Sequence, residues 1–320
     1  MRPAGSTGWK LATPAGVASN GGLVMAATGP TSLVTGFLPS QKLTFSPLAV
    51  TADSGAQWSK NTLLSPGFSD IPYALAASSS GELLALTGTG DVDASTNAGA
   101  TWRTMTTERN LAGSATARAC GVQALTAAAW TPTGAPLVAA RCAQRGAAGT
   151  FVLSARGWRR TGPPLPAGLS HDAVDVIGLA TTGQRTTVVL AAKSATATKM
   201  VVGWSADGGT TWRLSPALTA ASDIRPAVSI WADGSAGLVL TTGPAASATS
   251  GATIGWQSAG WRNLPLFPAR TSTLALAADG QPQALAVSGG TLTAWQLGAG
   301  SNRWIVTQTI QVPVPTGSSG

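Results

Sequence analysis

Charged side chains are scarce in this chain. The 320 residues include 20 Lys and Arg and 12 Asp and Glu, so that charged residues make up 10%, about half the share usual in a soluble protein. There is one histidine and one tyrosine, and the glutamates are limited to Glu82 and Glu108. Because general acid–base catalysis needs a matched acid and base within reach of each other, this inventory leaves few candidates for catalytic groups.

Clusters of basic residues are also missing, although the net charge is +8 and the isoelectric point is near 10.5. Arg159 and Arg160 form the only adjacent basic pair. Nucleic-acid-binding proteins usually carry basic clusters interleaved with aromatic residues, so the sequence predicts no nucleic-acid partner. A mild preference for anionic surfaces is the simpler interpretation of the charge.

No stretch of the chain approaches 18 consecutive apolar residues, so the sequence predicts no membrane span. The first eight residues, MRPAGSTG, lack the apolar core of a signal peptide. We interpret residues 1–8 as a linker and residues 313–320 as a tail. Met1 and the last few residues are expected to be additions made for expression, with a targeting segment removed that could have tethered the protein to a membrane.

The two cysteines, Cys120 and Cys142, flank the turn sequence TPTGAP. A hairpin folded at this turn would bring them opposite each other on paired strands, which predicts a disulfide worth about 3 kcal/mol. Such a bridge indicates an oxidising, extracytoplasmic setting. Two separate buried thiols are the alternative. The CxxC spacing of a zinc site is absent and the lone histidine is distant in sequence, so no metal and no cofactor are predicted.

One eight-residue phrase occurs three times, as TADSGAQW (51–58), STNAGATW (95–102) and SADGGTTW (205–212). Short polar side chains such as Ser205 and Asp207 bond nearby backbone N–H groups in turns, and Gly209 supplies a positive φ without steric cost. The apolar, β-branched runs on either side read as strands. The phrase therefore predicts a β-hairpin whose turn is held by its own side chains.

The tryptophan that ends this phrase recurs roughly every 50 residues, a period typical of propellers with four short strands per blade. Each interval parses into four strands, and no segment shows helical periodicity. We therefore predict an all-β fold, a six-bladed β-propeller of four-stranded antiparallel blades spanning residues 9–312, with seven blades as the alternative. Trp9 is then left over, and we expect it to pack beside the last blade. The repeated tryptophans are Trp9, Trp58, Trp102, Trp158, Trp212, Trp261 and Trp304.

The repeated phrase resembles the Asp-box, or BNR repeat, of bacterial sialidases and other β-propellers. In that family the box lies in the turn between the third and fourth strands of a blade, away from the catalytic face. The resemblance implies a structural role, with a calcium site as a weaker alternative because one carboxylate per turn gives too few oxygen ligands. The matching residues are Thr51, Asp53, Gly55, Trp58, Ser95, Asn97, Gly99, Trp102, Ser205, Asp207, Gly209 and Trp212.

Sialidases need three arginines, a Tyr–Glu nucleophile pair and an acid/base Asp, and the first arginine lies in a Phe/Tyr-Arg-Ile-Pro motif. The nearest phrase here is Ser69-Asp70-Ile71-Pro72, in which Asp70 replaces the arginine and would repel a substrate carboxylate. Tyr73 is the only tyrosine, and of the two glutamates only Glu108 lies in a loop between predicted blades. Sialidase activity is therefore not expected.

In propellers, ligands meet the face formed by the loops between blades and by those joining the second and third strands of a blade. The loops between the predicted blades carry more charge than the strands. Each loop aspartate could instead cap its own loop by bonding backbone N–H groups. The candidate ligand-binding residues are Asp70, Arg118, His171, Asp172, Asp223, Arg225 and Arg270.

These observations predict a non-catalytic, secreted or extracytoplasmic propeller that binds a partner protein or a cell-envelope glycan through its loop-rich face. A binding face needs only convergent polar groups around an apolar mouth. The alternative is a glycoside hydrolase of unknown specificity that uses Glu108 with one of the loop aspartates. The pairs Asp91 with Asp93 and Asp172 with Asp175 are close in sequence but match no motif.

Overall fold

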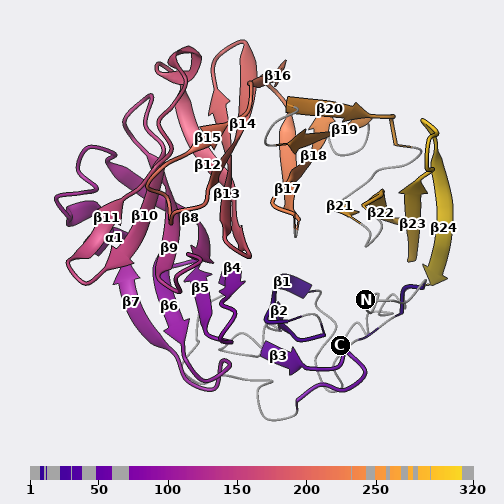
Figure 1. The fold of residues 1–320 in the computed structure, drawn as a ribbon, viewed down its shortest axis with the longest axis horizontal. Coiled ribbons are helices and arrows are strands. Elements are labelled where there is room, and N and C mark those ends of the chain that lie inside the picture. Colours follow the sequence, from indigo (N-terminus) through magenta and orange to yellow (C-terminus); the bar gives the residue numbers. More distant parts are fainter. Residues whose placement is uncertain are drawn as a thin grey trace, which may run out of the picture.

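The computed structural model is an all-β propeller, in which small antiparallel sheets are arranged around a central axis (Figure 1). The structure describes residues 8–10, 12, 22–29, 31–37, 48–59, 72–231, 233–242, 249–256, 260–267, 273–276, 280–288 and 290–311. Asp70 and Arg270 lie outside these residues.

Each sheet takes consecutive strands of the chain, which pair as up-and-down neighbours. The strands are β1 (Gly22–Ala27), β2 (Leu33–Phe37) and β3 (Leu48–Thr51); β4 (Pro72–Ala77), β5 (Leu83–Thr87), β6 (Asp91–Ser95) and β7 (Arg103–Thr107); β8 (Val122–Trp130), β9 (Pro136–Cys142), β10 (Gly149–Ser154) and β11 (Gly157–Arg160); β12 (Ala173–Thr182), β13 (Arg185–Lys193), β14 (Ala197–Ser205), β15 (Arg213–Leu214) and β16 (Leu218–Ala221); β17 (Arg225–Ile230), β18 (Ala236–Thr242), β19 (Thr249–Trp256) and β20 (Gly260–Leu264); and β21 (Thr273–Leu276), β22 (Pro282–Ser288), β23 (Thr291–Leu297) and β24 (Trp304–Gln311).

The number of complete blades differs from the sequence prediction. Within the described ranges, five sheets have four or more strands, and the β1–β3 sheet has three. The structure therefore shows five complete blades, and the predicted six, like the alternative of seven, was wrong as a count of complete blades. After β3, the Ser59 N–H bonds the carbonyl of Val50 at 2.8 Å, and residues 60–71 lie outside the described ranges.

The β12–β16 sheet contains five strands because its outermost strand is interrupted. β14 pairs with β15 near Trp204 and with β16 near Lys199. Pro216 lies between these two short strands and has no backbone N–H to donate to the ladder. The sheet is therefore a four-stranded blade with a broken outer strand.

The hydrophobic core lies between neighbouring blades. The second strand of a blade is the most buried, as in β5, where all five residues are buried. One cluster joins Leu84 and Leu86 to Phe151 of the next sheet, and a second joins Leu137 to Leu190. Because both faces of each sheet are covered by a neighbouring sheet, the strands read as continuous apolar runs rather than strictly alternating ones.

Three of the repeated tryptophans form hydrogen bonds to the preceding blade, which agrees with the prediction that these residues lie between blades. The indole N–H of Trp212 donates to the carbonyl of Thr161 at 2.9 Å, and that of Trp261 donates to Pro216 at 2.8 Å. Trp304 bonds Pro265 in the same way at 2.9 Å. Each acceptor lies one or two residues after the end of β11, β15 or β20 in the preceding blade, so these bonds join successive blades.

The N-terminal tryptophan packs against the last blade, as the sequence predicted. The backbone N–H of Trp9 donates to the side-chain carbonyl of Gln308 on β24, and the Gln308 amide donates to the Trp9 carbonyl at 2.8 Å. The two ends of the described chain therefore meet at β24.

Helical structure is limited to two short segments in the part of the chain that is described. These are α1 (Glu108–Gly113) and the 3-10 turn η2 (Ala167–Leu169). The Thr107 hydroxyl caps α1 by accepting from Asn110 N–H at 3.1 Å. A helix of this length shows no apolar period, so sequence analysis could not detect it.

The predicted disulfide between Cys120 and Cys142 is confirmed. Val122 pairs directly with Cys142 in the β8–β9 hairpin, so the hairpin places the two cysteines side by side. Both sulfur-bearing residues are buried.

Candidate functional site

Six of the described turns share one hydrogen-bond pattern. In each, a Ser or Thr hydroxyl accepts the backbone N–H of the residue four positions later, at 2.7–3.2 Å. The residue three positions later has a positive φ, between 55° and 86°. We call these the stapled turns. They begin at Thr51, Ser78, Thr87, Ser95, Thr131 and Ser205.

Asp207 forms the densest network among the stapled turns. Its carboxylate accepts from the Thr211 hydroxyl at 2.6 Å, from Thr211 N–H at 2.8 Å and from the Ser205 hydroxyl at 2.8 Å. These bonds, led by that from the Thr211 side chain, lower the pKa of Asp207 to about 2. The bond from Gln57 N–H likewise lowers the pKa of Asp53.

In the second copy of the phrase, Asn97 performs the same task without a charge. Its side-chain carbonyl accepts from Thr101 N–H at 2.9 Å, and its amide donates to the Thr101 hydroxyl at 2.9 Å. A carboxylate and an amide thus stabilise equivalent turns, and the side-chain bonds of Asp207 and Asn97 named above each stay within their own turn. The geometry is that of a structural element.

The strand order places two kinds of connection on opposite faces. Within each blade, the first strand starts and the second ends on the face of the between-blade connections, which we call the loop-rich face. The turns from first to second strand and from third to fourth strand lie on the other face, which we call the turn face. The three copies of the repeated phrase therefore lie on the turn face.

The disulfide anchors part of the loop-rich face. The Gln144 N–H bonds the Cys120 carbonyl at 3.1 Å, and Gly146 N–H bonds the Asp172 carbonyl at 2.9 Å. A Cβ on Gly146 would lie 2.0 Å from the Ser170 carbonyl oxygen, and Gly146 has a φ of 71°. The β9–β10 loop and the loop carrying His171 and Asp172 are therefore in tight contact.

The structure places the five described candidate ligand residues on this loop-rich face without joining them into one cluster. Arg118 lies in the turn after α1, and His171 and Asp172 lie just before β12. Asp223 and Arg225 lie at the entry to β17, where both side chains are exposed. No ion pair links any of these described side chains to another.

An ion pair on this face was missed by sequence reasoning. Arg141 Nε lies 2.6 Å from Asp175 Oδ1, with 52% and 37% of the two side chains exposed. It joins β9 to the first strand of the next blade, and the bond to Asp175 raises the pKa of Arg141. In the sequence, Arg141 is a single charged residue in an apolar strand. Its ion pair with Asp175 becomes visible only when the two neighbouring blades are placed side by side.

Tyr73 and Glu108 lie close enough on this face to interact. The Tyr73 hydroxyl donates to the Leu125 carbonyl on β8. Burial, followed by the charge of Glu108, raises the pKa of Tyr73. The Glu108 side chain packs beside Gly90 in the β5–β6 turn, where a Cβ would lie 3.2 Å from that of Glu108.

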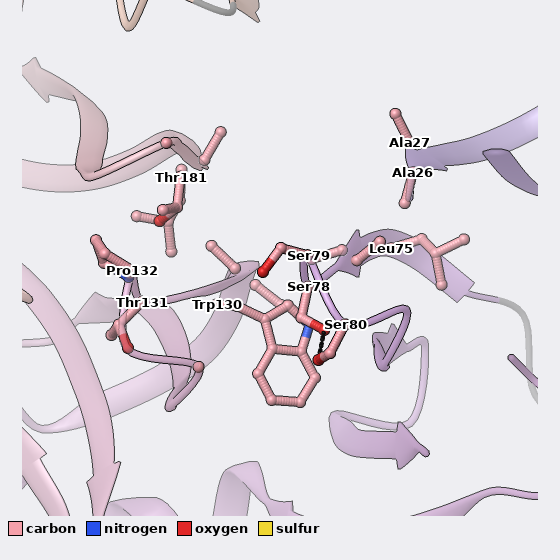
Figure 2. A pocket seen from close by; sticks show the side chains of 18 residues that line it. Ala26, Ala27, Leu75, Ser78, Ser79, Ser80, Trp130, Thr131, Pro132 and Thr181 are labelled. Carbon is pink, nitrogen blue, oxygen red and sulfur yellow. Dashed lines mark hydrogen bonds between the residues drawn. The ribbon is translucent and has the colours of Figure 1, made fainter. Parts of the chain in front are cut away.

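A cavity of about 290 Å³ opens at the opposite end of the propeller axis, on the turn face. The ends of β4, β8 and β12 and the turns that follow them contribute to its wall, as Figure 2 shows for Ser78, Trp130 and Thr181. None of the five described candidate ligand residues lines it. The sequence offered no signal for this cavity, because its described lining residues are mostly alanines, serines and threonines scattered over several repeats.

Within the described ranges, no group of three or more His, Cys, Asp or Glu side chains is placed to hold a metal ion. Among the same residues, no helix is long and apolar enough to cross a membrane.

Comparison with known proteins identifies the fold but no family. No family model matches the sequence, and no curated protein sequence matches it. Solved structures match at low identity. Hydrazine synthase of Kuenenia stuttgartiensis aligns with a TM-score of 0.55 and 11% identity, over 90% of this chain and 80% of that chain. YCF48 bound to D1 peptide aligns at 0.51 and 12%, over 85% and 78%.

The polysaccharide lyase Uly1 aligns with a TM-score of 0.56 and 10% identity, over 94% of this chain and 82% of that chain. The neighbours are β-propeller proteins. At these identities the likeness concerns the fold alone, and a propeller fold hosts many unrelated functions. The chain is therefore similar in architecture to propellers of diverse activities.

Proposed function

We propose that this protein is a non-catalytic binding propeller whose loop-rich face captures a partner protein or a cell-envelope glycan. The observation that carries the proposal is that two side chains on that face, of the kinds that catalysis would need, are already engaged in bonds within the protein. Asp175 is held by Arg141 at 2.6 Å, and the Tyr73 hydroxyl is bonded to a backbone carbonyl.

The electrostatics of Tyr73 support the same conclusion. Burial and the charge of Glu108 both raise its pKa, so the phenol stays protonated at neutral pH. An activated nucleophile or base needs the opposite, a pKa brought toward the working pH. Tyr73 with Glu108 is therefore suited to packing and to hydrogen bonding with a ligand rather than to attack on one.

The disulfide supports an extracytoplasmic or secreted location, because such bridges persist in oxidising compartments. A tether in a segment preceding this chain would fit that location. The stapled turns at Thr51, Ser95 and Ser205 support membership of the Asp-box propellers without sialidase chemistry. We further propose one propeller domain over residues 9–312, which includes the β1–β3 sheet beside the five complete blades.

Two structural neighbours indicate the range of partners. One was solved with a D1 peptide, and another, an ulvan lyase, was solved bound to a glucuronate–rhamnose sulfate chain. Both a peptide and a glycan are thus bound by proteins of this architecture. For the present chain, the exposed, oppositely charged pair of Asp223 and Arg225 suits either kind of polar partner.

A matched pair of charge reversals tests the proposal. Arg225 begins β17 on the loop-rich face, and Arg213 begins β15 near the turn face, and both are exposed. Wild type, Arg225→Glu and Arg213→Glu would be compared for binding to purified peptidoglycan fragments and to immobilised cell-envelope proteins by biolayer interferometry. We expect Arg225→Glu to weaken binding at least about tenfold, equivalent to about 1.4 kcal/mol, with an unchanged melting temperature.

Arg213→Glu should bind like wild type. Equal loss in both variants would indicate a non-specific charge effect and would contradict the assignment of the face. The rival function, a glycoside hydrolase, is tested in the same preparation: turnover of a glycoside that disappears in Glu108→Gln would replace the binding proposal with an enzyme.

A further inference from the structure

No charged group is found among the described residues that line the cavity on the turn face. Each described residue that lines it is Ala, Leu, Gly, Pro, Ser, Thr or Trp. Its volume of about 290 Å³ lies just below the range for small-molecule sites, which begins near 300 Å³, so only a small ligand would fit. A charged ligand would lose its hydration here without gaining a counter-charge, which is costly.

The hydroxyl groups around the cavity are held in place by the stapled turns. Ser78 Oγ accepts Glu82 N–H at 3.0 Å and lies 2.8 Å from Ser80 Oγ. Thr131 repeats this arrangement with Ala135 N–H at 2.9 Å. In Figure 2, Ser79 lies at the cavity between Ser78 and Thr181. These hydroxyls are pre-oriented donors and acceptors, so a ligand need not order them on binding.

The innermost strands add backbone groups to the wall. β4, β8 and β12 are each the first strand of their sheet, with a hydrogen-bonded neighbour on one side only. Their ends, at Ala77, Trp130 and Thr181, line the cavity. An edge strand presents N–H and C=O groups that sheet pairing does not use, and here they face the axis of the propeller.

The cavity wall also contains a buried donor that lacks an acceptor. Trp130 is 7% exposed, and its indole Nε1 has no hydrogen-bond partner among the described residues. Figure 2 shows this nitrogen on the ring edge turned toward Ser78 and Ser80. An unsatisfied buried N–H costs free energy, so this part of the wall favours an acceptor over a donor.

We propose that this cavity is a binding site for an uncharged, hydroxylated ligand the size of one sugar ring, such as a neutral monosaccharide unit. Sugar hydroxyls would exchange hydrogen bonds with the turns at Ser78 and Thr131, and sugar C–H groups would pack on the alanine methyls of the inner strands. An acidic or sulfated sugar is excluded by the uncharged lining. This site is separate from the loop-rich face and lies at the other end of the axis.

Substitution of an exposed turn residue tests the proposed site without changing the hydrophobic core. Ser79 is exposed and is the second residue of its stapled turn, and Ala52 is exposed at the same position of the turn that begins at Thr51. Ala52 does not line the cavity. Ser79→Phe therefore fills the mouth of the cavity, and Ala52→Phe adds the same ring to an equivalent turn elsewhere.

Saturation-transfer difference NMR would be recorded with the methyl glycosides of glucose, galactose, rhamnose and N-acetylglucosamine, beside methyl glucuronide and an Ala/Ser hexapeptide. We expect at least one neutral glycoside to bind, Ser79→Phe to weaken it about tenfold or more, and Ala52→Phe to leave it unchanged. Methyl glucuronide should bind at least about tenfold more weakly.

Three results would overturn the proposal: no neutral glycoside binds, binding survives Ser79→Phe, or the hexapeptide binds while the sugars do not. Arg225→Glu should leave the glycoside signal intact, and Ser79→Phe should leave capture by the loop-rich face intact. Failure of the sugar site is thereby distinguished from failure of the proposed function.

Discussion

Removal of the Cys120–Cys142 bridge should destabilise the protein by an amount that follows from the chain it closes. The two cysteines are 22 residues apart, and the loop-entropy relation for this length gives about 3 kcal/mol. With an unfolding entropy of about 2.1 cal/mol/K per residue, the 320 residues convert this free energy into a drop in melting temperature of about 5 °C.

The variant Cys120→Ala/Cys142→Ala would be compared with wild type by differential scanning calorimetry without reductant. Alanine is chosen because both cysteines are buried, and a serine hydroxyl would add a desolvation cost. Hydrogen exchange should show the loss locally, in residues 114–121 and 143–149, which the bridge connects. The single variant Cys120→Ala serves as the control for side-chain loss with one thiol retained, and it should be as unstable as the double variant.

Two results would refute this reasoning. A double variant that melts within about 1 °C of wild type would show that the constraint contributes little to the folded protein. A mass measurement on non-reduced wild type that finds two alkylatable thiols would show that the bridge does not form.

Three further predictions concern the stapled turns and the tryptophans between blades. Asp207→Ala should lower the melting temperature at pH 7. Because the pKa of Asp207 in the folded protein is lowered to about 2 from an ordinary 3.8, its stabilising contribution is complete above pH 3.8 and is lost as the pH falls through about 2. A difference between variant and wild type that persists undiminished at pH 2 would contradict this account. Ala98 has a φ of 55°, and Ala98→Gly should stabilise by about 0.5–1 kcal/mol in urea unfolding, whereas Ala100→Gly in the same turn should not. Trp261→Phe removes the N–H that bonds Pro216 and should cost about 1 kcal/mol; unchanged stability would show that these bonds do not join the blades.

The sequence predicted the elements of the fold that are local. The turn at Ser205, the Cys120–Cys142 hairpin and the contact of Trp9 with the last blade all follow from nearby residues or from a repeat period. The number of complete blades did not follow, because a parse into apolar runs does not show which runs pair into complete ladders. The short helix α1 was invisible for a related reason, since one capped turn has no periodicity.

For the candidate site, the sequence predicted only the face of the propeller on which its residues lie. Arg118, Asp172 and Arg225 lie on the loop-rich face because their loops join one blade to the next. The pairing of Arg141 with Asp175 and the bond from Tyr73 to Leu125 depend on which strands become neighbours across blades. The cavity at Ser79 and Trp130 depends on several repeats meeting at the axis, and no single repeat carries a sign of it.

Hydrogen–deuterium exchange with and without a bound partner tests the central claim most directly, because it reports which face is covered. Purified peptidoglycan fragments, or a captured envelope protein, would be added at saturating concentration. The account predicts slower exchange in residues 114–121, 143–149, 166–175 and 218–225, which form the loop-rich face. Slower exchange confined to the stapled turns at 51–58, 95–102 and 205–212, with the loop-rich face unchanged, would contradict it.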